Sequence, residues 1–450
     1  MANVIKTKKG LDINLVGEAP KVEVLASPVR SYGVVPDHFS GIIPRLSVKE
    51  GDHVQAGDAV IYHKNEPMLK LTAPVSGEIV EVKRGAKRKI LYVQIKPEST
   101  IDYKEFDVAN AKMKSREDIL NLLGESGLLA LFRNRPYDMI VDPKVTPRDI
   151  YVTGYLSAPL MPDVISLVKD DLKYLQNAID VIGKLTKGDV YMGVKKGTPL
   201  EVKNCKVYEI DGPHPAGNAS VFINHTKPLN RGENVWAIGL TELALIGRFL
   251  ATGRVDMSRK VVFAGSCFES AGYATVRSGS EVNDLTAGKI EDGKRSVRII
   301  DGDVLTGTKL TEDYRYMSPF SNIISAIPEG DDVNELFGWA ALGMKKYSVN
   351  RSYPTFLFGK SRKYDIDARL KGGTRAIIVS NEYDKVFPLD IYPEQLVKAT
   401  IAFNIDKMEE LGIYEVAPED FALCEFVDTS KLELQYIIRK GLDELYKEMN

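Results

Sequence analysis

The stretch from residue 41 to 97 constrains the fold most. In it, short β-branched runs alternate with Gly-Asp, Asn-Glu-Pro and Pro-Val-Ser-Gly turns, which is the spacing of hairpins rather than of helices. The pairs Gly51-Asp52 and Gly57-Asp58 follow each other closely. Glycine allows the positive φ of a tight turn, and the aspartate side chain can close that turn. We therefore predict a small all-β sandwich within residues 1–97.

The same stretch resembles the biotinyl/lipoyl hammerhead, a barrel-sandwich hybrid. A V-x-x-G-D-x-V-x-x-G-D-x-V pattern at 48–60 precedes an A-P-x-x-G turn at 73–77. A carrier domain of this kind has a modifiable lysine at the apex of the hairpin before that turn. By spacing the apex falls at Glu66, and the nearest lysines, Lys64 and Lys70, are out of register. The sequence thus favours the fold without the swinging arm.

Length, charge and apolar runs limit the number of domains and the classes of protein to which the chain can belong. The 450 residues suggest about three domains, since domains average roughly 150 residues. Sixty basic and 62 acidic residues give a net charge of −2, so no electrostatic feature indicates nucleic-acid binding. The uncharged apolar runs are shorter than the ~20 residues of a membrane-spanning helix. The N-terminal lysines are not followed by an apolar signal core, so we expect a cytoplasmic protein.

The cysteines and histidines do not form a metal-binding pattern. Cys205, Cys267 and Cys424 lie far apart and are odd in number, which is typical of reduced thiols in a cytosolic protein. The chain contains neither C-x-x-C nor H-E-x-x-H. We therefore expect no iron–sulfur centre, zinc site or catalytic metal, and we expect Cys267 to be a buried structural residue.

Residues 98–265 alternate helix and strand patterns, which favours an α/β layer of the doubly wound type. Ser115 and Asp118 fit the start of a helix. Further helices are predicted at 163–183 and from a cap at Thr241 to Gly253, and strands at 149–153, 190–194, 235–238 and 260–264. Since no G-x-G-x-x-G follows any of these strands, dinucleotide binding is disfavoured.

Two short segments could contact a ligand. In the run G-L-L-A-L-F-R-N-R-P-Y at 127–137, Arg133 and Arg135 lie beside Phe132 and Tyr137. Planar cations and aromatic rings can stack on a flat ligand and donate to its carbonyls; alternatively, the arginines stand at a helix C-terminus. The loop G-P-H-P-A-G-N at 212–218 could clasp a ligand or partner, although a rigid turn is favoured.

The predicted secondary structure changes twice in the last third of the chain. Residues 266–303 have short strands and turns, and residues 304–450 are mainly helical. One helix is predicted from Pro393 towards Gly412, and another after Ser430.

Four motifs together resemble one family over the whole chain. They are K-K-G-L-D-I-N-L at 8–15, R-G-A-K-R at 84–88, G-P-H-P-A-G at 212–217 and E-D-F-A-L-C-E-F-V-D-T-S-K at 419–431. They are similar to the A subunit of the sodium-translocating NADH:quinone reductase, whose architecture is similar to the complex I flavoprotein subunit and the C subunit of the Rnf complex.

This resemblance implies a division into four parts. These are a barrel-sandwich hybrid (1–97), a Rossmann-like α/β domain without a flavin loop (98–265), a small β-grasp-like domain of the SLBB type (266–303) and a mainly helical domain (304–450). Relatives bind FMN with a glycine-rich loop, which corresponds here to Ser126–Phe132, where leucines replace glycines. They also have an iron–sulfur cysteine run, of which Cys424 is left. FMN, FAD, riboflavin and iron–sulfur centres are therefore expected only in partner subunits.

The resemblance also implies a quinone-facing role. In the family that role belongs to the regions that correspond here to 34–44 and 133–137, so the candidate quinone-binding residues are Pro36, Phe39, Phe132, Arg133, Arg135 and Tyr137. The chain would lie peripherally on the cytoplasmic face of the bacterial inner membrane, held by the other five subunits of the reductase and above all by its membrane-embedded B subunit. The alternative is an architectural subunit, a flavoprotein fold that has lost its cofactors. No complete active site is expected in this chain alone.

Overall fold

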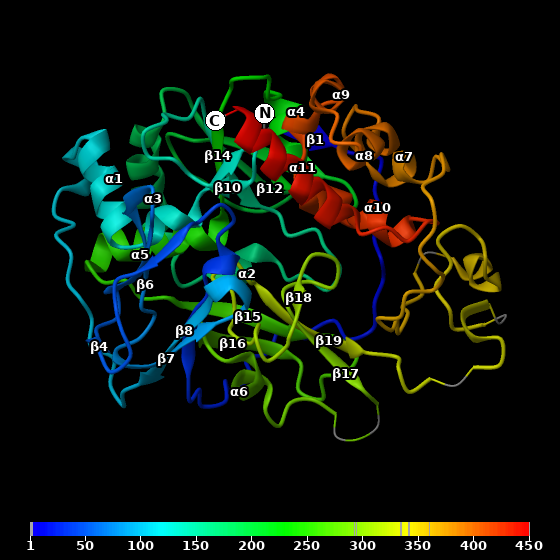
Figure 1. Cartoon of the computed structure of the whole chain (residues 1–450), viewed down its shortest axis with the longest axis horizontal. Helices are drawn as coiled ribbons and strands as arrows, with labels where there is room; N and C mark the ends of the chain where they lie inside the picture. The colour runs from blue at the N-terminus through cyan, green and yellow to red at the C-terminus, as the bar shows by residue number, and fades with distance from the viewer. Residues whose placement is uncertain are drawn as a thin grey trace.

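The computed structural model describes residues 3–291, 293, 295–333, 335–340, 343–359 and 361–449 (Figure 1). Its centre is a seven-stranded sheet in which neighbouring strands are parallel except at β9 and β10, which are antiparallel to their neighbours. The strand order is β1 (Asn3–Lys6), β13 (Lys206–Asp211), β12 (Val190–Lys195), β11 (Ile150–Gly154), β14 (Val235–Gly239), β9 (Arg133–Arg135) and β10 (Met139–Ile140).

Both faces of this sheet are buried. Ile150 and Val152 of β11 pack into the cluster that contains the helices α3 (Leu172–Ile182) and α5 (Leu240–Thr252), whereas Tyr151 between them packs against α4 (Ala219–Thr226). Alternate residues of a strand point to opposite faces, so a strand covered on both sides is apolar throughout. The helix α1 (Arg116–Glu125) begins with the predicted capping box of Ser115 and Asp118.

Three predictions about this region are wrong. The predicted helix 163–183 is two helices, α2 (Val164–Val168) and α3, and Asp170 and Asp171 between them pair with Lys260 and Arg248. The helix α5 is capped at Gly239 rather than Thr241, although it ends at Gly253 as predicted. Arg133 to Arg135 are in a strand, which excludes the alternative that they end a helix.

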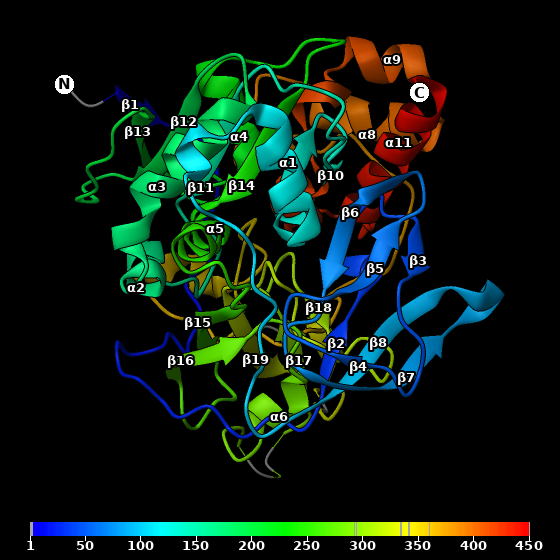
Figure 2. The same cartoon turned by 90° about the vertical axis from the view of Figure 1, so that its left-hand side faces the viewer.

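Two small antiparallel sheets near the N-terminus form the predicted sandwich (Figure 2). One contains β2 (Tyr32–Val34), β8 (Ile90–Pro97), β7 (Gly77–Arg84) and β4 (His53–Val54), and the other β3 (Pro44–Leu46), β5 (Ala59–His63) and β6 (Glu66–Thr72). The two Gly-Asp turns have the predicted geometry: Gly51 and Gly57 have φ of +85° and +97°, and Asp52 and Asp58 each accept a backbone N–H at 2.9 Å.

A third body is a five-stranded sheet in the order β16 (Gly272–Arg277), β15 (Ser258–Ala264), β19 (Ile323–Pro328), β17 (Val297–Asp301) and β18 (Thr308–Lys309), with the short helix α6 (Val282–Thr286). The strand predicted at 260–264 belongs to this sheet and not to the central layer, because β15 pairs with β16 and β19. Likewise β1 leaves the N-terminal sandwich and pairs with β13. Pairing partners distant in sequence decided both placements.

Helices gather at the C-terminus around a separate core, which includes Leu396, Leu423 and Leu442 (Figure 1). They are α7 (Tyr383–Val386), α8 (Pro393–Ile401), α9 (Ile405–Glu410), α10 (Ala422–Val427) and α11 (Leu434–Met449). The single helix predicted from Pro393 towards Gly412 is interrupted, because Phe403 has a φ of +50° and Asn404 caps a new helix at the N–H of Lys407. Cys267 and Cys424 are buried, and all three cysteines are free.

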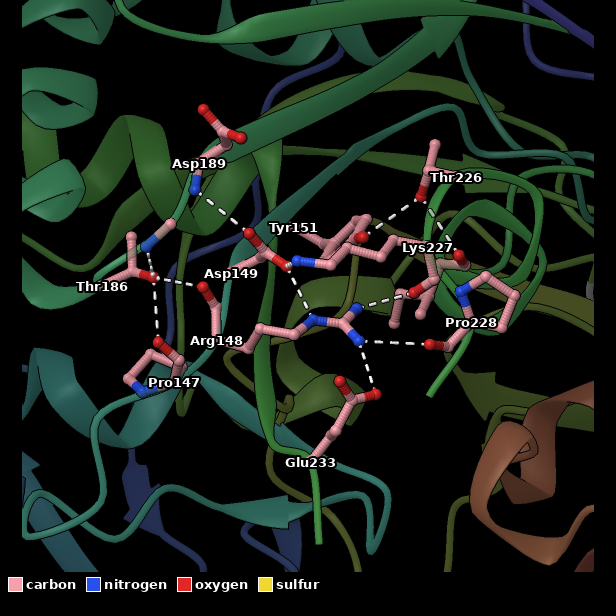
Figure 3. Close-up of polar contacts among 12 residues, drawn as sticks. Pro147, Arg148, Asp149, Tyr151, Thr186, Asp189, Thr226, Lys227, Pro228 and Glu233 are labelled. Carbon is pink, nitrogen blue, oxygen red and sulfur yellow. Dashed lines mark hydrogen bonds and ion pairs between the residues drawn. The ribbon is translucent and has the colours of Figure 1, made fainter. Parts of the chain in front are cut away.

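Charged side chains tie together the amino ends of the central strands (Figure 3). Asp149 is 1% exposed and accepts from Arg148 at 2.7 Å, from Lys227 at 3.1 Å and from the N–H of Asp189 at 3.1 Å. Arg148 also pairs with Glu233 at 2.7 Å. Burial by itself would raise the pKa of Asp149, but these donors hold it below its usual value. The network therefore stabilises the sheet at the edge opposite the carboxyl ends of its strands.

Candidate functional site

The order of the central strands reverses beside β11. The chain continues from β11 to β12 and β13 on one side, whereas β14 pairs on the other. In open α/β sheets a crevice opens at the carboxyl ends of the strands at such a reversal. A cavity of about 350 Å³ lies there, between Thr153 and Tyr155 at the end of β11 and Ile238 and Gly239 at the end of β14. We refer to it as the switch-point cavity.

Arg133 lines the switch-point cavity. Its Nη2 donates to the backbone carbonyl of His38 at 2.7 Å, and its guanidinium carbon lies 4.1 Å from the ring centroid of Phe320, which also lines the cavity. Its Nη1 is buried and has no hydrogen-bond partner among the described residues. Burial and the nearby Arg133 lower the pKa of His38 to about 3, so His38 is neutral. The Nη1 group of Arg133 is thus a buried donor that the described residues leave unpaired.

Arg135 lines the same cavity but is fixed by carboxylates. It is 5% exposed, and its Nη2 lies 2.9 Å from Glu419 and 3.4 Å from Asp138. Its Nη1 donates to Ser220 at 3.2 Å. Burial by itself would lower the pKa of Arg135, but Asp138 and Glu419 raise it. These contacts hold the side chain of Arg135 in place where it lines the cavity, so we regard it as a structural residue of the site.

The other four predicted residues lie outside the residues that line this cavity. Phe132 is fully buried against Trp236, with ring centroids 5.7 Å apart. Tyr137 packs edge-on against Tyr446 of α11. Pro36 is buried at the start of a short 3₁₀ turn. Phe39 packs edge-on against Phe320 at 5.5 Å and so reaches the cavity wall only indirectly.

The two candidate regions, 34–44 and 133–137, nevertheless meet in space. Arg133 donates to His38, and the N–H of Ile140 donates to the carbonyl of Ser40 at 2.9 Å. Ser40 itself lines the cavity. The resemblance therefore paired two segments that the fold brings into contact, although only part of each faces the cavity.

His214 was singled out only as part of a loop, yet it lines the switch-point cavity and is 3% exposed. Its Nδ1 lies 3.0 Å from the hydroxyl of Ser157, and its Nε2 is buried without a partner among the described residues. The sequence analysis assigns no site role to Phe320 or Glu419, which both line the cavity. Glu419 stands in a motif that we quoted, but no local pattern marks Phe320, because its role depends on a strand 187 residues earlier in the chain.

The segment that corresponds to the relatives' flavin loop is part of the core. Leu128 to Leu131 form a 3₁₀ turn, and all four are buried. The cavity beside Ser126 and Gly127 measures about 50 Å³.

A third cavity of about 490 Å³ lies between β17, β19 and the C-terminal helices. Its described lining includes Leu15, Tyr347 and Phe426 and none of the six predicted residues. Across the described part of the chain, no three His, Cys, Asp or Glu side chains are grouped to hold a metal. No helix among the described residues has the length and apolar character needed to cross a membrane.

Three family models match consecutive parts of the chain. The NqrA N-terminal barrel-sandwich hybrid domain matches residues 5–98, and the NqrA second alpha/beta domain matches residues 114–255. The NQRA C-terminal domain, of the SLBB type, matches residues 261–312.

Curated relatives match over the full length. The A subunit of the Na(+)-translocating NADH-quinone reductase of Photorhabdus laumondii is 30% identical, with 99% of this chain and 100% of the relative covered. The A subunit of the same reductase from Serratia proteamaculans is 32% identical over the same shares. A chain of a NAD⁺-reducing [NiFe]-hydrogenase is similar over 68% of this chain and 56% of its own, at 10% identity and a TM-score of 0.34, which is too weak to support an argument. From its full-length relatives and its three matching domain models, the chain belongs to the family of the A subunit of Na(+)-translocating NADH-quinone reductase.

Proposed function

We propose that this chain is the peripheral quinone-binding subunit of a sodium-pumping NADH:quinone oxidoreductase, and that the quinone headgroup occupies the switch-point cavity. The observation that carries the proposal is Arg133, which lines the cavity, stacks on Phe320 and has a buried Nη1 without a partner among the described residues. A charged donor of this kind suits a quinone carbonyl, and the aromatic ring beside it suits a flat ligand.

The remaining parts of the reaction belong to other subunits in this proposal. The buried leucines at 128–131 leave no glycine cradle for a flavin phosphate, so FMN, FAD, riboflavin and iron–sulfur centres are assigned to partners. The chain would be held on the cytoplasmic face of the inner membrane by the other subunits of the complex, above all the membrane-embedded B subunit. We expect the purified chain to show no flavin absorbance after gel filtration, and a stoichiometric flavin band would contradict this assignment.

We further propose a Rossmann-like fold for the domain of the seven-stranded sheet and a β-grasp-like fold for that of the five-stranded sheet. The parallel order of β13, β12, β11 and β14 supports the first. The helix α6 between β16 and β17 supports the second.

An architectural role is the second candidate. The observation that favours it is Arg135, whose two terminal nitrogens contact Glu419, Asp138 and Ser220 and join the central sheet to the C-terminal region. In that case the switch-point cavity would be a remnant of a cofactor-binding ancestor, and the chain would only stabilise the complex.

Calorimetric titration of the full chain with a short-chain, water-soluble 1,4-benzoquinone separates the two candidates. The test variant is Arg133→Met, which keeps the bulk of the side chain and removes its donors. The matched control is Arg231→Ala, an arginine that pairs with Glu409 outside the cavity. A hydrogen bond from a charged donor contributes about 1.5–3 kcal/mol, so Arg133→Met should weaken binding roughly ten-fold or more.

The quinone-binding role and the architectural role predict different results in this titration. Weaker binding in Arg133→Met with an unchanged control and an unchanged melting temperature supports the quinone site. If the wild type does not bind the quinone, or if Arg133→Met binds it as tightly as the wild type, the architectural role is favoured.

A further inference from the structure

The loop Gly212–Asn218 is clamped onto the loop that follows β11. The backbone N–H of Gly217 donates to the hydroxyl of Ser157 at 3.0 Å, and the hydroxyl of Tyr155 donates to the carbonyl of Gly212 at 3.1 Å. A Cβ on Gly217 would lie 2.1 Å from the carbonyl oxygen of Tyr155. Only glycine permits this approach, so the contact holds His214 at the wall of the switch-point cavity.

The N-terminal segment holds the same loop from its other side. Asp12 accepts the backbone N–H of His214 at 3.0 Å, and the N–H of Leu11 donates to the carbonyl of His214 at 2.8 Å. The backbone of His214 is thus hydrogen-bonded on both sides, and its position does not depend on its ring. Any role of the imidazole must come from its two nitrogens.

The imidazole of His214 is neutral. Burial lowers its pKa below the usual value, and Asp303 and Asp12 oppose that effect only in part. A neutral imidazole has one N–H and one acceptor nitrogen. The carboxylates near it are already hydrogen-bonded: Asp12 to the backbone of His214, and Asp303 to the N–H groups of Leu305 and Thr306.

Ser157 is the hydrogen-bond partner of the imidazole: its hydroxyl oxygen accepts from the N–H of Gly217 and lies 3.0 Å from the Nδ1 of His214. We assign the hydroxyl proton to the bond with Nδ1. With Nδ1 as the acceptor, the ring proton is on Nε2. Nε2 is the atom that is buried without a partner among the described residues, and buried polar atoms nearly always have one.

We propose that His214 is a second anchor of the ligand in the switch-point cavity, where its Nε2–H donates to a carbonyl oxygen and Ser157 keeps the ring in that tautomer. The inference rests on the proposed function and specifies its ligand: a flat molecule with two carbonyl acceptors, one for Arg133 and one for His214. Ser157 is a positioning residue, since it acts through the ring of His214.

Binding and infrared spectroscopy of the full chain test this anchor with the same short-chain 1,4-benzoquinone. His214→Phe keeps a flat ring without a donor and should weaken binding about ten-fold, whereas His214→Gln provides an amide N–H near the position of Nε2 and should restore much of the loss. Ser157→Ala should weaken binding by a few fold. The matched control, His225→Phe, alters a histidine at the end of α4 that does not line the cavity, and should bind as the wild type does.

Isotope-edited infrared spectra of the wild type do not depend on whether a variant folds. With ¹³C at each quinone carbonyl in turn, both C=O stretches should shift to lower frequency on binding, and His214→Gln should retain both shifts. If only one carbonyl shifts in the wild type, or if His214→Phe binds normally while Arg133→Met does not, the second anchor is wrong and the quinone site stands. If the wild type does not bind the quinone at all, the proposed function itself fails.

Discussion

Arg135 of strand β9 and Glu419 of the C-terminal region form an ion pair at 2.9 Å although 284 residues separate them. The pair joins the antiparallel edge of the central sheet to the helices at the C-terminus. Arg135 also lies 3.4 Å from Asp138, so its buried guanidinium is shared by two carboxylates.

Arg135→Ala should reduce the free energy of unfolding by about 3–5 kcal/mol, because it leaves partly buried carboxylates without their cation. The matched control is Arg231→Ala, since Arg231 pairs with Glu409 at 2.8 Å but its side chain is 64% exposed. Loss of such an exposed pair should cost less than about 1 kcal/mol. Urea titration measures both values, and equal losses would contradict a structural role for Arg135.

Asp149→Ala should destabilise the chain by a similar amount, about 3–5 kcal/mol, because Arg148 and Lys227 both depend on this buried carboxylate (Figure 3). The folded-state pKa of Asp149 lies below its usual value, so its contribution is present above the unfolded pKa and is lost as the pH falls through the folded pKa. Denaturant titration from pH 7 to pH 3 checks both points. Asp211→Ala removes the exposed pair with Lys196 and is the control; a comparable loss there would argue against the network.

Asp301→Asn should make the chain less sensitive to pH. Asp301 is 4% exposed and accepts the N–H of Ser318 at 2.7 Å, and burial raises its pKa to about 6. A raised carboxyl pKa gives stability below the unfolded pKa of 3.8, which is lost as the pH rises through about 6. Relative to Asp301→Asn, we expect the wild type to lose roughly 2–3 kcal/mol of stability over that range, which is the contribution of this one carboxyl. Asp313→Asn, at an exposed site, is the control, and an unchanged slope in Asp301→Asn would refute the assignment.

Gly217→Ala should destabilise the loop that holds His214, by about 1–3 kcal/mol, because the added Cβ would lie 2.1 Å from the carbonyl oxygen of Tyr155. Gly183→Ala is the matched control: its Cβ would lie 3.7 Å from Val190, an ordinary contact. Thermal melting compares the two variants. A melting temperature for Gly217→Ala equal to that of the control would mean that the loop has more room than the structure indicates.

Features that depend on a few neighbouring residues could be predicted from the sequence. The turns at Gly51 and Gly57, the capping box of Ser115 and Asp118, and the end of α5 at Gly253 all depend on hydrogen bonds or backbone angles within one turn. The sequence analysis did not predict two helix interruptions, one before α9 and one before α3. The first has a local cap that was overlooked, and the second involves a partner distant in sequence. Asn404 caps a new helix locally, whereas Asp170 pairs with Lys260, 90 residues later.

The sequence by itself determined the family and the local turns and caps, whereas the domain bounds and the site residues remain predictions. Only the tertiary structure decided that Arg133 lines the cavity while Phe132 and Tyr137 do not, that β1 and β15 pair outside their expected sheets, and that Ser157 lies beside His214. The physical reason is that a strand's sheet and a side chain's cavity depend on partners distant in sequence. The hydroxyl of Ser157 lies 3.0 Å from the Nδ1 of His214 although 57 residues separate them, and no local pattern encodes this contact.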